Sequence, residues 1–107
     1  MAQKKAVIIR TDGTIEHVLI DGLADMQKAV GGLIEMAGRI GGSDMYANEE
    51  GIIMGLAPNL KATALRNQTG LWSPYPIHGD VLLIGGDDET GDTVDVSEKA
   101  VMMAERL

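Results

Sequence analysis

The residues best suited to metal chemistry gather in one acidic stretch. Hard cations need several oxygen ligands, but an EF-hand spacing is absent, because the position five residues before Gly91 is Gly86, which has no side-chain ligand. We therefore expect a solvated acidic turn here, and no metal site. The stretch contains five carboxylates and no lysine or arginine: Asp87, Asp88, Glu89, Asp92 and Asp95.

Two histidines, His17 and His78, are the side chains suited to proton transfer near neutral pH. Neither has a local serine or a spaced set of carboxylates that would indicate a catalytic triad or a zinc site, and the chain contains no cysteine. The three glycine pairs of the chain match neither a dinucleotide-binding fingerprint nor a P-loop; they are Gly31-Gly32, Gly41-Gly42 and Gly85-Gly86. The sequence therefore predicts a protein that is not an enzyme and has no cofactor.

A weaker pattern suggests a site for an anion or another small ligand. Four polar residues could form a locally basic patch beside the N-terminus of a short helix, which is a favourable place for negative charge. The competing interpretation, which we favour, is an ordinary solvated helix. The four residues are Asn59, Lys61, Arg66 and His78.

The segment at 71–76, with the sequence LWSPYP, is the best candidate for contact with a protein partner. It holds two of the three aromatic residues and two of the three prolines of the chain, so we expect an ordered loop. Trp72 and Tyr75, with Pro76 beside them, would offer large apolar contact at little entropic cost. The alternative is that the loop covers the core, since an aliphatic core has reason to enclose its only tryptophan.

A continuous apolar run, Val81–Ile84, lies between glycine-containing turns and leads into the acidic stretch. Such a run is typical of a strand buried on both faces, and we expect it to be the central strand of a sheet.

Asp12-Gly13 separates two β-rich runs and predicts a hairpin over 5–20. Its register stays open, because a two-residue turn pairs Ile8 with His17, whereas a three-residue loop pairs Val7 with His17.

Apolar residues at helical spacing predict a main helix from Gly22 to Ile40, with Asp21 as its N-cap. Gly31-Gly32 would lie in its middle, where each glycine costs about 1 kcal/mol relative to alanine. Close packing of these glycines on a strand or on a second subunit would offset that cost. A ligand that approaches the helix backbone at Gly31 and Gly32 is the sharper alternative.

The remaining segments predict a second hairpin and two short helices. The hairpin pairs residues 45–47 with 52–56 around a turn at 48–51. Asn59 caps a helix at 60–67 that exposes Arg66, and Asp95 caps a terminal helix. The whole chain, 1–107, is then a single α+β domain. Its sheet is mostly antiparallel with about five strands, formed by two hairpins and a central strand, and it carries one main helix and two short helices.

Length and charge restrict the class of protein further. A chain of 107 residues can bury one core without disulfides. A formal net charge of -7 argues against direct binding to nucleic acid or to anionic membranes. The apolar run after Lys5 is too short to cross a membrane or to form a signal sequence, so we expect a cytoplasmic protein.

Six segments together span nearly the whole chain: KAVIIRTDG at 5–13, AVGG at 29–32, MYANEEG at 45–51, Asn59 with ATAL at 62–65, GDVLLI at 79–84 and GDT at 91–93. Taken in order, they resemble the domain of unknown function 3846 family. That family is common in bacteriophages, plasmids and the bacteria that carry them. The resemblance therefore implies an accessory protein of a mobile element, and it implies no reaction.

Three hypotheses for function follow. The first is a non-enzymatic phage or mobile-element accessory protein that binds a host protein and forms a small homo-oligomer such as a homodimer. The second is a binder of small, nucleotide-like molecules through the basic patch. The third is an acidic DNA mimic that blocks a restriction enzyme, and we rank it last because the carboxylates concentrate in one loop.

Overall fold

The computed structural model describes residues 3–69, 72–87 and 89–107. None of the helices in these ranges is long and apolar enough to cross a membrane. In chain order the elements are β1 (Lys4–Ile9), β2 (Ile15–Ile20), α1 (Leu23–Val30), β3 (Ile34–Ile40), β4 (Ser43–Asn48), α2 (Leu60–Asn67), β5 (Val81–Gly86), β6 (Thr93–Val94) and α3 (Glu98–Glu105).

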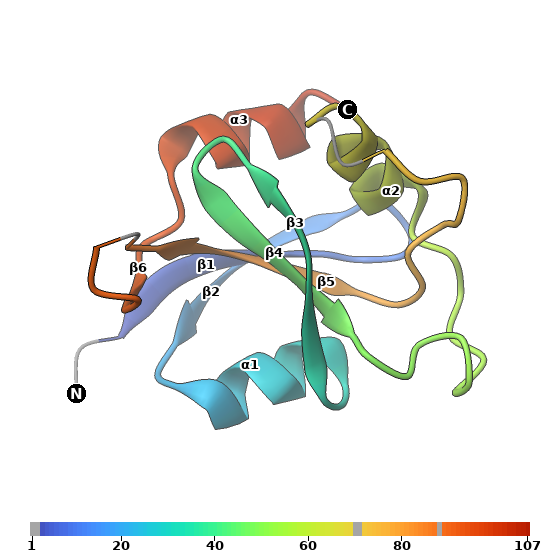
Figure 1. Cartoon of the computed structure of the whole chain (residues 1–107), viewed down its shortest axis with the longest axis horizontal. Coiled ribbons are helices and arrows are strands. Elements are labelled where there is room, and N and C mark those ends of the chain that lie inside the picture. Colours follow the sequence, from blue (N-terminus) through green and yellow to red (C-terminus); the bar gives the residue numbers. More distant parts are fainter. Residues whose placement is uncertain (1–2, 70–71, 88) are drawn as a thin grey trace.

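The strands form one antiparallel sheet in the order β2-β1-β5-β4-β3, and the short β6 pairs with the end of β5. Figure 1 shows this sheet crossing the molecule, with α1 on one face and α2 and α3 on the other. The prediction of an α+β domain with a mostly antiparallel sheet is confirmed. The run Val81–Ile84 is its central strand, between β1 and β4.

Both faces of β5 are buried because alternate side chains enter two separate clusters. Val81 and Leu83 pack in the cluster beneath α2 and α3, and Leu82 and Ile84 pack in the cluster beneath α1. This alternation is the two-residue period of a strand, applied to a run that is apolar at every position. Helices are therefore needed on both faces.

The first hairpin has the three-residue loop. Val7 pairs with His17, and the Arg10 backbone N–H donates to the carbonyl oxygen of Thr14 at 2.9 Å. Gly13 has a φ of 88°, a left-handed conformation that glycine adopts without strain. This register places His17 on an exposed position of β2, where its Nε2 lies 3.7 Å from a carboxylate oxygen of Glu105 in α3.

The prediction of one helix over 22–40 was wrong. α1 ends at Val30, and Gly31 follows with a φ of 79° while its N–H donates to the carbonyl oxygen of Gln27 at 2.9 Å. Gly31 is thus the left-handed glycine that terminates the helix, and no glycine lies inside it. The N-cap position is held by Gly22, with no side-chain capping bond, so the predicted cap at Asp21 was also wrong.

The second hairpin is formed by other residues than predicted. The segment Ile34–Ile40, assigned from sequence to the helix, is β3, and it turns at Gly41-Gly42 into β4. A register shift between Met36 and Gly38 marks a β-bulge in β3. Residues 49–55 form consecutive turns instead of the predicted strand over 52–56.

The other two helices, α2 and α3, have the same length of eight residues as α1 and differ in how well their starts were predicted. Asn59 caps α2 as expected, and its Oδ1 accepts from the backbone N–H of Ala62 at 3.0 Å. α3 is capped by Ser97 and not by Asp95, because the Ser97 hydroxyl is fixed between the Ala100 N–H and the carbonyl oxygen of Gly41. Asp95 instead accepts from the Lys5 N–H at 2.8 Å.

Candidate functional site

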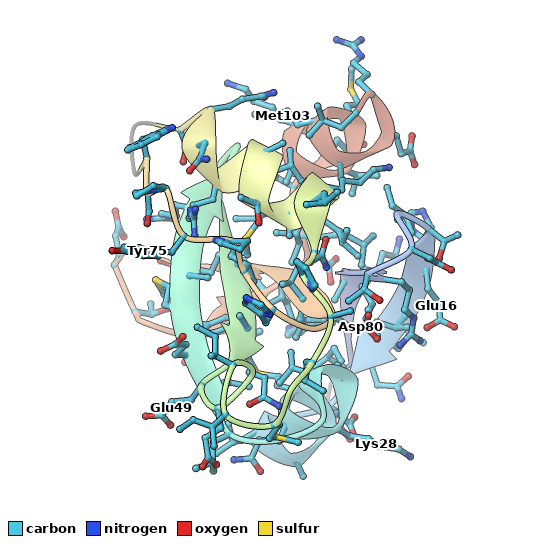
Figure 2. All side chains as sticks on the ribbon, turned by 90° about the vertical axis from the view of Figure 1, so that its right-hand side faces the viewer. Glu16, Lys28, Glu49, Tyr75, Asp80 and Met103 are labelled. Atoms are coloured by element: carbon cyan, nitrogen blue, oxygen red, sulfur yellow. The ribbon has the colours of Figure 1, made fainter. Side chains whose placement is uncertain are left out.

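A cavity of about 460 Å³ opens between the β3–β4 hairpin, the turns at 49–55 and the loop at 72–77. It brings together four residues that were singled out from the sequence for two different roles: Arg66, Tyr75, Pro76 and His78. Figure 2 shows Tyr75 and Glu49 on the same side of the molecule, beside these strands. The candidate partner loop and part of the candidate ligand patch therefore belong to one site.

Arg66 is buried, contrary to the expectation that α2 would expose it, and only 9% of its surface is accessible. Its Nη2 donates to the carbonyl oxygens of Ser73 at 2.9 Å and Tyr75 at 2.7 Å. Its Nε donates to Oδ1 of Asn67 at 3.1 Å. Arg66 therefore fastens the loop at 72–77 to the side of α2.

The charge of Arg66 has no carboxylate partner within ion-pairing distance among the residues that the structure describes. Its Nη1 also makes no hydrogen bond in this part of the chain, whereas every fully buried side-chain nitrogen or oxygen there has a partner. Nη1 must therefore reach solvent, and Arg66 lines the cavity. A desolvated guanidinium with an accessible N–H pair favours an anion.

His78 lies half-buried in the cavity wall, and its Nδ1 is 2.9 Å from the carbonyl oxygen of Leu56. A carbonyl oxygen only accepts, so in the neutral ring Nδ1 carries the proton and Nε2 is left as an acceptor. The ring is thereby held in one orientation by the segment that follows the turns at 49–55.

The rim of the cavity is apolar and exposed. Ile52, Ile53 and Tyr75 line the cavity and expose 70%, 84% and 74% of their surfaces. Trp72 lies outside the cavity lining but on the same loop, and 67% of its surface is exposed. The alternative interpretation, in which the core encloses this tryptophan, is wrong. Leu71, at the start of the predicted loop, lies outside the described residues.

The other two residues of the predicted basic patch do not join the site. Asn59 is completely buried, and its Nδ2 donates to the carbonyl oxygens of Ile9 at 2.9 Å and Gly79 at 3.0 Å. Its polar atoms are thus used to tie α2 to the ends of β1 and of the segment before β5. Lys61 is half-buried on α2, away from the cavity lining.

The close approach expected at Gly31-Gly32 exists at Gly32, but its cause is a polar side chain of β4. A Cβ on Gly32 would lie 2.9 Å from Nδ2 of Asn48, which donates to the Val30 carbonyl oxygen at 3.1 Å. Oδ1 of Asn48 accepts from the Glu50 N–H at 2.8 Å. Asn48 therefore joins the end of α1 to the turns that form the cavity.

The acidic segment is organised as a turn. Oδ1 of Asp87 accepts from the backbone N–H groups of Glu89 at 2.8 Å and Thr90 at 3.2 Å. The residues that the structure describes contain no group of three or more His, Asp or Glu side chains placed to hold a metal ion. Asp88, one of the five carboxylates, lies outside those residues.

A second, more apolar groove of about 620 Å³ lies between β2 and α3. Leu19 of β2 and Met102 of α3 line it and expose 55% and 47% of their surfaces. His17 also lines this groove, whereas none of the residues named from the sequence for partner or ligand binding does.

Sequence reasoning missed Ile52, Ile53 and Glu35 as parts of the site. The first two were assigned to a strand, although Gly51 and Gly55 bracket a run of only three apolar residues there. Such a short run between glycines is better suited to a turn than to a paired strand. Glu35 was hidden by the assignment of its segment to a helix.

A family model described as Domain of unknown function (DUF3846) matches residues 4–107, nearly the whole chain. No curated protein and no solved structure matches the sequence or the fold.

Proposed function

The chain belongs to the DUF3846 family, and on this premise we propose that it is a non-enzymatic accessory protein that acts by binding a host protein. The binding surface is formed by Trp72 and Tyr75 together with Ile52 and Ile53 of the adjacent turns. In this proposal the protein is encoded by a phage or another mobile element and works in the cytoplasm of the host cell. The observation that carries it is the exposure of Trp72 and Tyr75, at 67% and 74%.

Large exposed apolar side chains that gather at one place are typical of interaction sites, whereas single ones are common on any surface. Tyrosine and tryptophan are also enriched among the residues that dominate binding energy. The loop that carries them is held by Arg66 through two backbone carbonyl oxygens. A loop fixed before binding loses little conformational entropy on association.

Affinity capture from host lysate tests this function. The wild-type protein should retain a specific host protein that the Trp72→Ala, Tyr75→Ala variant does not retain. Leu23→Ala is the matched control, because Leu23 is an exposed apolar residue, at 58%, on α1 and thus on the other face of the sheet. Equal capture by the wild type and the double variant, with both folded, would contradict the proposal.

We also propose that the protein is a homodimer, in which β2 of one copy pairs with β2 of the other. In the part of the chain that the structure describes, β2 is an edge strand of six residues without a bulge, whereas β3 at the opposite edge carries one. An unprotected edge can pair with the same edge of a second copy. Light scattering should give twice the monomer mass, and Leu19→Lys should reduce it to the monomer. A wild-type monomer at high concentration would contradict the dimer.

A further inference from the structure

We infer that the cavity beneath Tyr75 binds an apolar ligand that ends in a single carboxylate, with the Arg66 guanidinium as its anchor. The inference goes beyond the proposed host-protein function, because it assigns a ligand chemistry to the interior of the site. The ligand is either a small carboxylic acid or an acidic residue with apolar neighbours in the partner protein. Both present the same group to the cavity.

Arg66 is buried, and its charge has no ion partner among the described residues. Charged side chains are rarely buried without an ion partner, because desolvation disfavours the charged form unless it is compensated. Nη2 and Nε donate hydrogen bonds to three oxygens, from Ser73, Tyr75 and Asn67, and these bonds compensate the desolvation of the two nitrogens. Nη1 retains two N–H groups without a partner among the described residues. A carboxylate that accepts from Nη1 would complete the hydrogen bonding of the guanidinium with a charge-assisted bond.

The wall of the cavity combines apolar and polar side chains. Its volume of about 460 Å³ lies in the range of small-molecule sites. Ile52, Ile53, Pro76 and Ile77 supply apolar surface around the polar groups of Arg66 and His78. Ligand sites commonly combine a mostly apolar lining with a few polar groups that fix orientation. The ligand should therefore carry an apolar portion next to its charge.

Two acidic side chains give the cavity lining negative charge. Glu35 and Glu49 also line the cavity, and both are exposed. Their carboxylates repel a second negative charge, so a monoanion fits better than a phosphate group, which carries about -1.5 to -2 at neutral pH. A carboxylate is the common biological monoanion that pairs with a guanidinium.

Nuclear magnetic resonance titration with hexanoate tests the inference without any partner protein. Hexanoate should shift the Arg66 Nε–H resonance and the amide resonances of Ile52 and Ile53, with a Kd on the order of 1 mM. Hexanamide, which has the same shape without the charge, should bind at least about tenfold more weakly. Equal binding of the amide, or tighter binding of inorganic phosphate, would overturn the inference.

Two variants separate the ligand site from the stability of the loop. Arg66→Gln should weaken hexanoate binding by about tenfold or more, but it also removes bonds to the loop. Ile53→Glu adds repulsion at the rim, touches none of the Arg66 hydrogen bonds and should weaken binding by several fold. Unchanged affinity in Ile53→Glu would place the ligand elsewhere and overturn the inference.

A pair of peptides shows whether the carboxylate belongs to a small acid or to an acidic residue of the partner protein. A short acetylated peptide with glutamate between leucines is compared with the same peptide carrying glutamine. Tighter binding of the glutamate peptide than of hexanoate assigns the site to the partner protein, and the reverse order assigns it to a small acid. Trp72→Ala separates this inference from the proposed function, because it should weaken capture of the host protein and leave hexanoate binding unchanged. Loss of hexanoate binding in a folded Trp72→Ala variant would contradict the assigned site.

Discussion

Arg66 on α2 donates a hydrogen bond of 2.7 Å from Nη2 to the backbone carbonyl oxygen of Tyr75, so a buried cation holds the backbone beneath an exposed aromatic ring. A second bond, to the carbonyl oxygen of Ser73, fixes the loop at another point. A buried side chain therefore fixes the position of the surface proposed to bind a partner. Nη1 of the same side chain reaches solvent, and Arg66 lines the cavity.

Arg66→Met should release the loop at 72–77. Hydrogen bonds that involve a charged group contribute about 1.5 to 3 kcal/mol each, and water that reaches the cavity reduces this, so we expect a loss of about 2 to 4 kcal/mol. Urea unfolding measures the loss, and amide hydrogen exchange at Tyr75 and Ile77 shows its location. Lys61→Met on the same helix is the control and should change stability by less than about 0.5 kcal/mol. Unchanged exchange in the loop would contradict the role of Arg66.

Asn59→Ala should be more destabilising than the loss of a helix cap alone. A cap contributes about 1 kcal/mol, and the carbonyl oxygens of Ile9 and Gly79 would lose their buried donor as well, so we expect about 3 kcal/mol in total. Asn59→Asp retains the capping oxygen and removes the donor. It should be at least as destabilising in denaturant unfolding, and wild-type stability in Asn59→Asp would show that the donor does not matter.

The Asp12 carboxyl gives the protein a pH dependence in the acid range. Its pKa is held below the ordinary value of 3.8, chiefly by the hydrogen bond from the Thr14 hydroxyl and next by the one from the Thr14 backbone N–H. A lowered folded pKa means that the folded state binds this proton less readily than the unfolded state. The stabilisation is therefore fully present above the unfolded pKa and is lost as pH falls through the folded pKa.

Asp12→Asn should flatten this dependence, because the amide oxygen still accepts from Thr14 but does not titrate. Urea unfolding of both proteins between about pH 5 and about pH 2 should show the free energy of unfolding falling more steeply in the wild type. Parallel curves would mean that Asp12 makes the same contacts in the unfolded chain.

The features that were predicted correctly depend on neighbours in sequence. The central strand is recognisable because Val81–Ile84 is apolar throughout and lies between turns. The hairpin at Asp12-Gly13 and the cap at Asn59 are likewise set by residue types within a few positions. These signals hold without any knowledge of what packs against them.

The features that were missed depend on tertiary contacts. β3 is an edge strand whose bulge between Met36 and Gly38 breaks the two-residue alternation, so Ile34, Ala37 and Ile40 fall at a spacing that also fits a helix. Gly31 was then placed inside that helix although it ends one. The burial of Arg66 was missed because the loop at 72–77, which follows α2, folds back over the last turn of the helix.

The fluorescence of Trp72 tests whether the surface around this residue contacts a host protein. Trp72 is the only tryptophan of the chain and exposes 67% of its surface, so its emission reports on this surface alone when the partner's contribution is subtracted. Addition of the host protein captured from lysate should shift the emission of Trp72 to shorter wavelength and protect it from iodide quenching. Binding of that protein with Trp72 emission and quenching unchanged would show that the surface around Trp72 is not the contact.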